Sequence, residues 1–321
     1  TAGPTTERYA GGDTCSFVTS PPTGLARDTR VWVVGDSGLP GPAQNRVRDA
    51  FMNWTGSRGA DLWLMLGDNA YNSGTDTEYT NGVFVPYAKH LRKWCLWPTR
   101  GNPDGLLSGS NNDYYDFFTM PTAAEAGGKP SLGEAYYSFD YGDIHFICLD
   151  SEGVNRTPTG SMIPWLIGDL AANKLTWTIA FCHHPPYTKG SHDSDNIADS
   201  GGRMRDMRQY ALPVLEAGGV DLVMTGHSHS YERTFLMDGH YGFSGDLTDT
   251  MIKDAGSGRP DDTGPYLKPD TGPGANQGTV YVVAGSSGWA TSASGRHPIM
   301  HTALLEMGSL VLDIDGHRLD A

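Results

Sequence analysis

Six short stretches of the sequence carry side chains that can bind metal ions. They are Gly35-Asp36-Ser37-Gly38, Gly67-Asp68-Asn69-Ala70-Tyr71, Gly101-Asn102-Pro103-Asp104, His183-His184-Pro185-Pro186-Tyr187, Gly226-His227-Ser228-His229 and the isolated His192. A mixture of carboxylate, amide, phenol and imidazole donors suits transition-metal cations. Because one carboxylate can bridge two cations while the other donors complete both coordination spheres, these residues indicate a two-metal site. The candidate ligands are Asp36, Asp68, Tyr71, Asn102, His183, His227 and His229.

Each of these residues alone has an ordinary structural explanation, as a turn former, a loop aromatic or a core histidine. The pair His227 and His229, separated by one residue, is a stronger indication of a metal site. Ligand-type residues at five successive strand ends are improbable as a coincidence, which favours the metal-binding interpretation. A phenol has an ordinary pKa of about 10 and needs a strong Lewis acid to ionise near neutral pH. Tyr71 therefore points to a hard trivalent ion such as Fe(III).

Apolar runs typical of β-strands lead into these residues. They lie at 31–34 before Asp36, at 62–66 before Asp68, at 178–182 before His183, and at 222–224 before His227 and His229. In an open α/β sheet the carboxyl ends of the strands form the crevice in which ligands bind. We therefore expect the candidate ligands to converge at the carboxyl ends of the strands.

The pattern of apolar residues predicts an α/β fold with two sheets, built from βαβ units and flanked by helices. The expected elements are strand 31–35, helix 43–57, strand 61–67, helix 78–92, strand 94–100, a hairpin of 135–140 with 143–149, helix 164–173, strand 175–183, a polar loop 187–202, helix 203–217, strand 220–226, and strands 279–284 and 308–315. The Gly-, Asp- and Pro-rich stretch 244–278 is expected to be a long surface loop. Residues 1–29 are expected to form an irregular lead-in, and 30–321 a single domain.

Composition narrows the classes of protein to consider. The chain has 321 residues, of which 38% are hydrophobic, and a formal net charge of −14. Such an acidic chain is a poor candidate for binding duplex nucleic acid, which requires clustered Lys and Arg. Bound cations would reverse the local potential, so a small phosphorylated substrate remains compatible with the charge. No apolar stretch approaches the roughly 20 residues of a membrane helix, so membrane insertion is not expected. The sequence indicates nothing about the oligomeric state.

The cysteines and the first residue are relevant to whether the protein is exported from the cell. Cys148 and Cys182 lie in apolar strand-like runs and are expected to be buried free thiols, whereas Cys15 and Cys95 can form one disulfide if the protein is exported. The sequence starts at Thr1 without a signal-like apolar segment. This start fits either a processed, exported protein or a trimmed chain.

The motif set resembles the purple acid phosphatases of the calcineurin-like metallophosphoesterases, over roughly residues 31 to 316. Tyr71 in Gly-Asp-x-x-Tyr is the feature that separates the purple enzymes from their relatives, and Gly226-His227-Ser228-His229-Ser230-Tyr231-Glu232-Arg233 is also similar. The chain is similar to the small, single-domain type with a metallophosphoesterase-like sandwich. The resemblance implies a secreted or periplasmic acid phosphatase that hydrolyses phosphate monoesters, with substrate and inorganic phosphate as its ligands.

The same resemblance implies a role for each candidate residue. Asp36, Tyr71 and His229 would bind Fe(III). Asn102, His183 and His227 would bind a divalent ion (Fe, Zn or Mn), and Asp68 would bridge the two. His192 follows His183 by nine residues, where the family has a histidine that contacts the substrate phosphate. A metal-activated hydroxide would then attack phosphorus in line with the leaving group, while the two cations neutralise the developing charge.

One position departs from the family pattern. The family reads Gly-Asn-His followed by an acid, whereas this chain reads Gly101-Asn102-Pro103-Asp104. Proline has no proton to donate, so help in protonating the leaving group would come from His192 or water. Proline also favours an extended conformation at Asn102, which is compatible with that residue remaining a ligand. The departure indicates weakened monoester hydrolysis. Two alternatives stay open: a phosphodiesterase or nucleotide-cleaving enzyme, and a metal- and phosphate-binding protein with little turnover.

Overall fold

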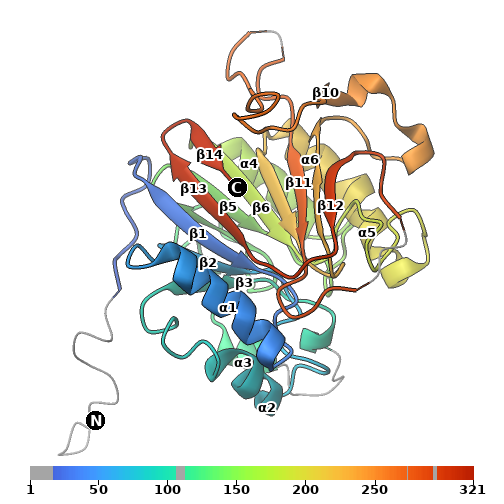
Figure 1. Ribbon diagram of the computed structural model, residues 1–321. Helices are drawn as coiled ribbons and strands as arrows, with labels where there is room; N and C mark the ends of the chain where they lie inside the picture. The colour runs from blue at the N-terminus through green and yellow to red at the C-terminus, as the bar shows by residue number, and fades with distance from the viewer. Residues whose placement is uncertain (1–16, 106–112, 273, 292–294) are drawn as a thin grey trace, which may run out of the picture.

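The computed structural model describes residues 17–105, 113–272, 274–291 and 295–321. Two mixed sheets lie at its centre (Figure 1). The first has the strand order β14 (Arg318–Asp320), β13 (Leu310–Asp315), β1 (Thr29–Val34), β2 (Leu62–Met65) and β3 (Cys95–Pro98). The second has the order β12 (Met300–Leu304), β8 (Tyr231–Thr234), β11 (Val280–Ala284), β7 (Leu222–Thr225), β6 (Trp177–Cys182), β5 (Ile144–Cys148) and β4 (Tyr137–Tyr141). The expected two-sheet α/β fold is confirmed.

Each sheet contains a parallel set of strands that carries the predicted motifs at its carboxyl ends. In the first sheet β1, β2 and β3 run parallel, with Val31 opposite Leu62 and Trp63 opposite Leu96. In the second sheet β5, β6, β7 and β11 run parallel, with Phe181 opposite Met224. The loops after β1, β2, β3, β6 and β7 therefore hold all of the candidate ligands.

Helices cover the outer faces of the two sheets (Figure 1). α1 (Pro42–Thr55), α2 (Asp76–Tyr79) and α3 (Asp113–Phe117) lie on the side of the first sheet. α4 (Met162–Ala172), α5 (Arg203–Asp206) and α6 (Leu212–Ala217) belong to the side of the second. α1 begins with Pro42, which suits a first helical turn because its missing N–H would have no partner there.

The core follows the alternation of side chains along the strands. In β6, Ile179 and Phe181 face the core shared with the first sheet, whereas Ala180 and Cys182 pack with α4 and α6. Val31 to Val34 of β1 are all fully buried, as expected for a parallel strand covered on both faces. Burial on both faces makes the strand ends fixed points from which the loops project.

The expected helix 78–92 is wrong in extent. Thr75 and Glu78 form a capping box that starts α2, but α2 ends at Tyr79 and passes into a π-helical turn over Thr80–Phe84. Pro86 cannot donate a backbone hydrogen bond, which disfavours a continuing helix. Two side chains of α1 also donate hydrogen bonds to backbone carbonyl groups of this segment. Gln44 donates to the carbonyl of Gly82 (2.6 Å), and Arg48 donates to that of Pro86 (2.7 Å).

The expected helix 203–217 is divided, because a π-helical turn (Met207–Ala211) separates α5 from α6. The short strands β8, β12 and β14 were not expected, nor was the small pair of β9 (Leu236–Met237) and β10 (Ile252–Asp254). The described part of 244–278 is a loop, as expected, with two 3₁₀ turns and β10. The hairpin of β4 and β5 is confirmed, with Gly142 in its turn at φ 60°.

Two sequence-based expectations concern cysteines and membranes. Cys148 and Cys182 are buried free thiols, as expected. Cys95 is exposed at the start of β3, and Cys15 lies outside the described residues, so their pairing stays a prediction. Among the described residues, no helix has the length and apolar character needed to cross a membrane.

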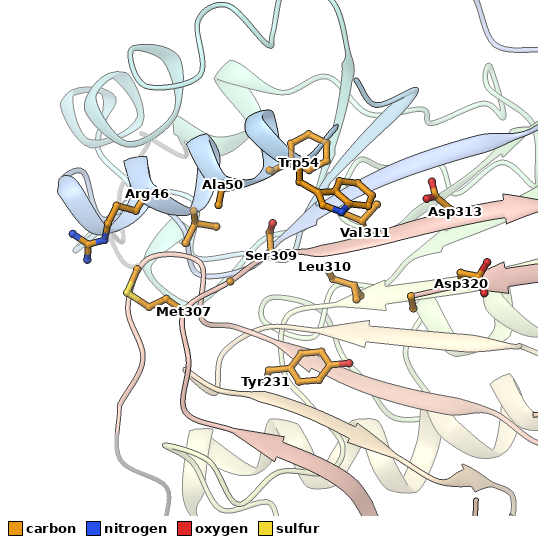
Figure 2. Close-up of a pocket in the computed structure, with 14 residues that line it drawn as sticks. Arg46, Ala50, Trp54, Tyr231, Met307, Ser309, Leu310, Val311, Asp313 and Asp320 are labelled. Atoms are coloured by element: carbon orange, nitrogen blue, oxygen red, sulfur yellow. The ribbon is translucent and has the colours of Figure 1, made fainter. Parts of the chain in front are cut away.

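A groove of about 800 Å³ lies between α1 and the strands β13 and β14. Figure 2 shows Arg46, Ala50 and Trp54 of α1 along one side, with Leu310 and Val311 of β13 opposite them. None of the candidate ligands lines this groove. It is therefore separate from the metal-binding motifs.

A buried ion-pair network in the second sheet gives a prediction about stability. The ring of His145 contacts Asp140 (2.8 Å) and Asp169 (2.9 Å). Burial alone would lower the pKa of His145, but the hydrogen bonds with these carboxylates raise it from 6.5 to about 9. The folded protein therefore holds a proton that the unfolded chain releases above pH 6.5. We expect the free energy of unfolding to fall by up to about 1.4 kcal/mol per pH unit between pH 6.5 and 9.

Denaturant unfolding followed by circular dichroism at several pH values measures this dependence. His145→Gln should lower stability at pH 6 and flatten the curve between pH 6.5 and 9. An unchanged slope in the variant would show that His145 does not carry the proton.

Candidate metal centre

The loops that follow the strands hold three candidate ligands in an unusual backbone conformation. Asp36, Asp68 and His227 adopt positive φ angles of 56°, 52° and 67°. Such angles cost of order 1–3 kcal/mol for a residue with a side chain, and they persist where surrounding structure enforces them. One such constraint is visible here, because the backbone N–H of His227 donates to the carboxylate of Asp36 (2.8 Å) across the two sheets.

The glycines of the motifs allow the loops to approach each other closely. A Cβ at Gly101 would lie 2.1 Å from the backbone nitrogen of Asp68, and one at Gly226 would lie 2.4 Å from Asp36 Oδ2. Side chains at either position would push the ligand-bearing loops apart. The glycines that precede Asn102 and His227 are thus part of the geometry of the site.

Four donor atoms form a first group around the phenol of Tyr71. Its hydroxyl lies 2.7 Å from Asp68 Oδ2, 3.3 Å from Asp36 Oδ1 and 3.4 Å from His229 Nε2. His229 Nε2 is also 3.5 Å from Asp36 Oδ1. The indole of Trp289 packs against the rings of both Tyr71 and His229, with centroid distances of 4.7 and 4.3 Å.

Four more atoms form a second group around His183 Nε2. This nitrogen lies 3.2 Å from Asp68 Oδ1, 3.1 Å from Asn102 Oδ1 and 3.2 Å from His227 Nδ1. Asn102 Oδ1 is also 3.0 Å from His227 Nδ1. The two oxygens of Asp68 thus face two different groups of donors.

The acceptor atoms of the second group are not paired with enough hydrogen-bond donors. His183 Nδ1 is 2.8 Å from the Leu66 carbonyl and must donate to it, so in the neutral ring Nε2 carries the lone pair. Burial and neighbouring histidines hold the pKa of His227 well below its usual range, so its ring is neutral. Asp68 Oδ1 is buried, and no donor among the described residues makes a well-aligned hydrogen bond to it. Electron pairs that converge in this way fit a cation, and the donors are of types that bind transition metals.

The first group likewise lacks a positive charge to balance its acidic side chains. Burial, and then the charges of Asp36 and Asp104, raise the pKa of Asp68 well above its usual range. Burial and the same Asp36 carboxylate raise the pKa of Tyr71 well above 10. A phenolate and two carboxylates at this spacing require positive charge between them. Atoms bound to one ion at ~2.1 Å lie about 3.0–3.4 Å apart, close to the separations in both groups.

His192 lies at the edge of the second group. Its ring stacks on that of His227 with a centroid distance of 3.9 Å, and its Nδ1 is 2.9 Å from Asp199 Oδ1. Its side chain is 31% exposed, whereas that of His183 is fully buried. His192 is therefore more accessible from solvent than His183, and also more than His229, whose side chain is 14% exposed.

The sequence analysis missed residues that hold the ligands in place. Asp104 is buried and accepts hydrogen bonds from the backbone of Gly101 (2.8 Å), Asn69 (3.0 Å) and Ala70 (3.2 Å), and from the hydroxyl of Tyr79 (2.8 Å). It thereby ties the loop of Asn102 to the loop of Asp68. The position of Asp104 at the end of the Gly-Asn-Pro-Asp motif is the sequence feature that could have identified it. Pro103, which lies between Asn102 and Asp104, is buried.

The buried ring of His184, which the sequence analysis did not assign to the site, lies 4.4 Å from that of His227. Its Nδ1 is 2.9 Å from the hydroxyl of Ser151. Ser200, also missed, lies 2.6 Å from His227 Nε2. No pattern in the sequence marks Ser151 or Ser200, because both belong to loops without a recognisable motif.

Comparison with known proteins agrees with this site. A family model described as calcineurin-like phosphoesterase matches residues 29–231, which is more than half of the chain. Purple acid phosphatase 23 of Arabidopsis thaliana is 33% identical over 248 residues, covering 68% of this chain and 50% of its own. Acid phosphatase type 7 of Mus musculus is 28% identical over 281 residues, covering 83% and 56%.

Among solved structures, a purple acid phosphatase from yellow lupin seeds superposes with a TM-score of 0.68 at 18% sequence identity. The match covers 94% of this chain and 52% of the lupin protein, and it shows that the fold is shared. The chain spans about half the length of these relatives. The resemblance inferred from the motifs is confirmed: the chain belongs to the calcineurin-like phosphoesterase family, and its homologues include proteins named purple acid phosphatase.

Proposed function

We propose that this protein hydrolyses phosphate monoesters at a dinuclear metal centre. Asp36, Tyr71 and His229 would hold one ion. Asn102, His183 and His227 would hold the other, and Asp68 would bridge both. The observation that carries the proposal is the division of the Asp68 carboxylate, whose Oδ2 faces Tyr71 and whose Oδ1 faces His183.

The bound metals and the side chains would contribute differently to the reaction. When bound, two cations supply a hydroxide near neutral pH and neutralise charge on the phosphoryl oxygens. The chain orients the ligands: the Leu66 carbonyl fixes the tautomer of His183, and Asp104 holds the loop of Asn102 against that of Asp68. His192, accessible and stacked on His227, is placed to contact the substrate phosphate.

The types of donor in each group support a proposal for the identity of each metal. The first group includes the phenol of Tyr71, which ionises beside a hard trivalent ion, so we propose Fe(III) there. The second group has an amide oxygen and two imidazoles, which suit divalent Fe, Zn or Mn. We also propose that residues 30–321 act as one domain and that the protein is exported. The names of its relatives support the further proposal that it is an acid phosphatase.

Replacing the bridging carboxylate tests the dinuclear centre. After reconstitution with Fe and Zn, the unaltered chain should hold about two metal ions. Asp68→Asn should hold at most about one, because the amide cannot serve as an anionic bridge, and its phosphatase activity should fall at least about 10³-fold. Elemental analysis and kinetics measure both quantities. Asp315→Asn, at an exposed aspartate of β13, is the control and should change neither. Equal metal content in the Asp68 variant would contradict the bridging role.

Tyr71→Phe tests the ferric half of the site. A phenolate bound to Fe(III) gives a visible charge-transfer band, so the reconstituted chain should be purple and the variant should lose this colour. The Zn content should stay the same, because Tyr71 belongs only to the first group. If the unaltered chain binds Fe(III) without colour, Tyr71 is not a ligand.

Pro103→His tests whether the proline weakens turnover. A histidine there would restore a proton donor, and general acid catalysis contributes about 10²–10⁴-fold. We expect kcat/KM to rise most for alkyl phosphates, whose leaving groups need a proton, and less for aryl phosphates. Pro103→Ala removes the ring without adding a donor and should give no such gain. Faster turnover of diesters than of monoesters by the unaltered chain would instead favour a phosphodiesterase, and tight phosphate binding without turnover would favour a binding protein.

A further inference from the structure

We propose that the turn Asp199–Gly202 positions two histidines of the site at once, through the adjacent side chains of Asp199 and Ser200. This inference rests on the proposed function, because it assumes that His227 binds a metal and His192 the substrate. Asp199 and Ser200 belong to no motif, and neither is itself among the candidate ligands.

Ser200 contacts the ring nitrogen of His227 that faces away from the other ligands. The Ser200 hydroxyl lies 2.6 Å from His227 Nε2, whereas His227 Nδ1 faces Asn102 and His183. A neutral imidazole has one N–H and one lone pair, and the hydrogen bond at one nitrogen determines which is which. With Nε2–H donating to Ser200, the lone pair of Nδ1 is directed toward the second group of donors.

Asp199 determines which ring nitrogen of His192 carries the proton. Its Oδ1 lies 2.9 Å from His192 Nδ1, and its Oδ2 accepts from the backbone N–H of Asp193 (2.9 Å). A carboxylate can only accept, so Nδ1 of His192 carries a proton, and in the neutral ring Nε2 carries the lone pair. The Ser200 hydroxyl also donates to Asp199 Oδ1 (2.8 Å), which links the two contacts.

Contacts with Arg203 and Glu152 anchor the turn. Ser200 has positive φ (52°), followed by Gly201 at 61° and Gly202 at 82°. Arg203 donates to the Ser200 carbonyl (2.9 Å) and pairs with Glu152 (2.8 Å). Glu152 in turn lies 3.7 Å from the ring of His184, which packs on His227. The hydroxyl of Ser200 is therefore held at a fixed place relative to the His227 ring.

Outer hydrogen bonds to a metal-binding histidine typically contribute 10–100-fold to metal affinity. Ser200→Ala and Ser200→Gly both remove the hydroxyl, but glycine adopts positive φ without strain and alanine does not. We expect both variants to bind Zn²⁺ about 10–100-fold more weakly than the unaltered chain, in titrations of protein already loaded with Fe(III) against a chromophoric chelator. Ser200→Asn, which tolerates positive φ and offers an acceptor oxygen, should recover most of the affinity.

Asp199→Asn should show the opposite pattern. Its amide can present either an oxygen or an N–H to His192, so the ring is no longer held in one tautomer. We expect kcat/KM for an aryl phosphate monoester to fall about tenfold or more, with Zn²⁺ affinity unchanged. The two variants thus separate a metal-positioning contact from a substrate-positioning contact, a separation that general loosening of the turn would not produce.

Several results would overturn the inference. Weaker Zn²⁺ binding in Ser200→Ala but not in Ser200→Gly would show that backbone strain, and not the hydroxyl, matters. A third bound Zn²⁺ that is lost in Asp199→Asn would show that His192, Asp199 and His227, which lie close enough to share an ion, form a metal site instead. If the unaltered chain binds two metals and hydrolyses the ester while both Ser200 variants behave like it, only this inference fails. Absence of metal binding in the unaltered chain would reject the proposed function itself.

Discussion

The site depends on one electrostatic constraint: buried acceptor atoms converge where protons alone do not satisfy them. Asp36, Asp68 and Asp104 are all buried within a small volume at the strand ends. Burying several carboxylates together costs several kcal/mol for each charge unless a cation or donors compensate. Asp104 is compensated by backbone N–H groups and the Tyr79 hydroxyl, whereas no donor among the described residues makes a well-aligned hydrogen bond to Asp68 Oδ1. This contrast separates a structural carboxylate from one available to a metal.

The two sheets are what bring the acceptors together. Asp36 and Asp68 follow strands of the first sheet, and His183 and His227 follow strands of the second. Helices cover the outer face of each sheet, and the carboxyl ends of the two parallel sets meet at one place. The hydrogen bonds from His227 to Asp36 and from His183 to the Leu66 carbonyl cross between the sheets and fix their relative position there.

Much of this arrangement is predictable from sequence because it depends on local rules. Apolar runs mark β1, β2, β6 and β7, and each candidate metal ligand follows the end of a strand within six residues. The helix after β2 was overestimated because Pro86 and the side chains of α1 end it through contacts that an apolar pattern does not reveal. Strands β8, β12 and β14 were missed since they are short and form the outer part of each sheet, where partial exposure weakens the pattern.

The residues around the ligands were harder to predict for a different reason. Ser200 reaches His227 across 27 residues of sequence, and Ser151 reaches His184 across 33. Serine is common in loops, so its type and spacing carry no signal before the fold is known. Asp104 is intermediate, since its motif position suggests a role, but its function as the tie between two loops becomes visible only in the structure.

The central claim is that Asp68 joins two metal ions in one site. Crystals of the chain loaded with Fe and Zn, with diffraction recorded at both absorption edges, test it most directly. The account predicts two anomalous peaks about 3.5–4 Å apart, the iron among Asp36, Tyr71 and His229 and the zinc among Asn102, His183 and His227. A single peak, or peaks that do not contact Asp68, would contradict it.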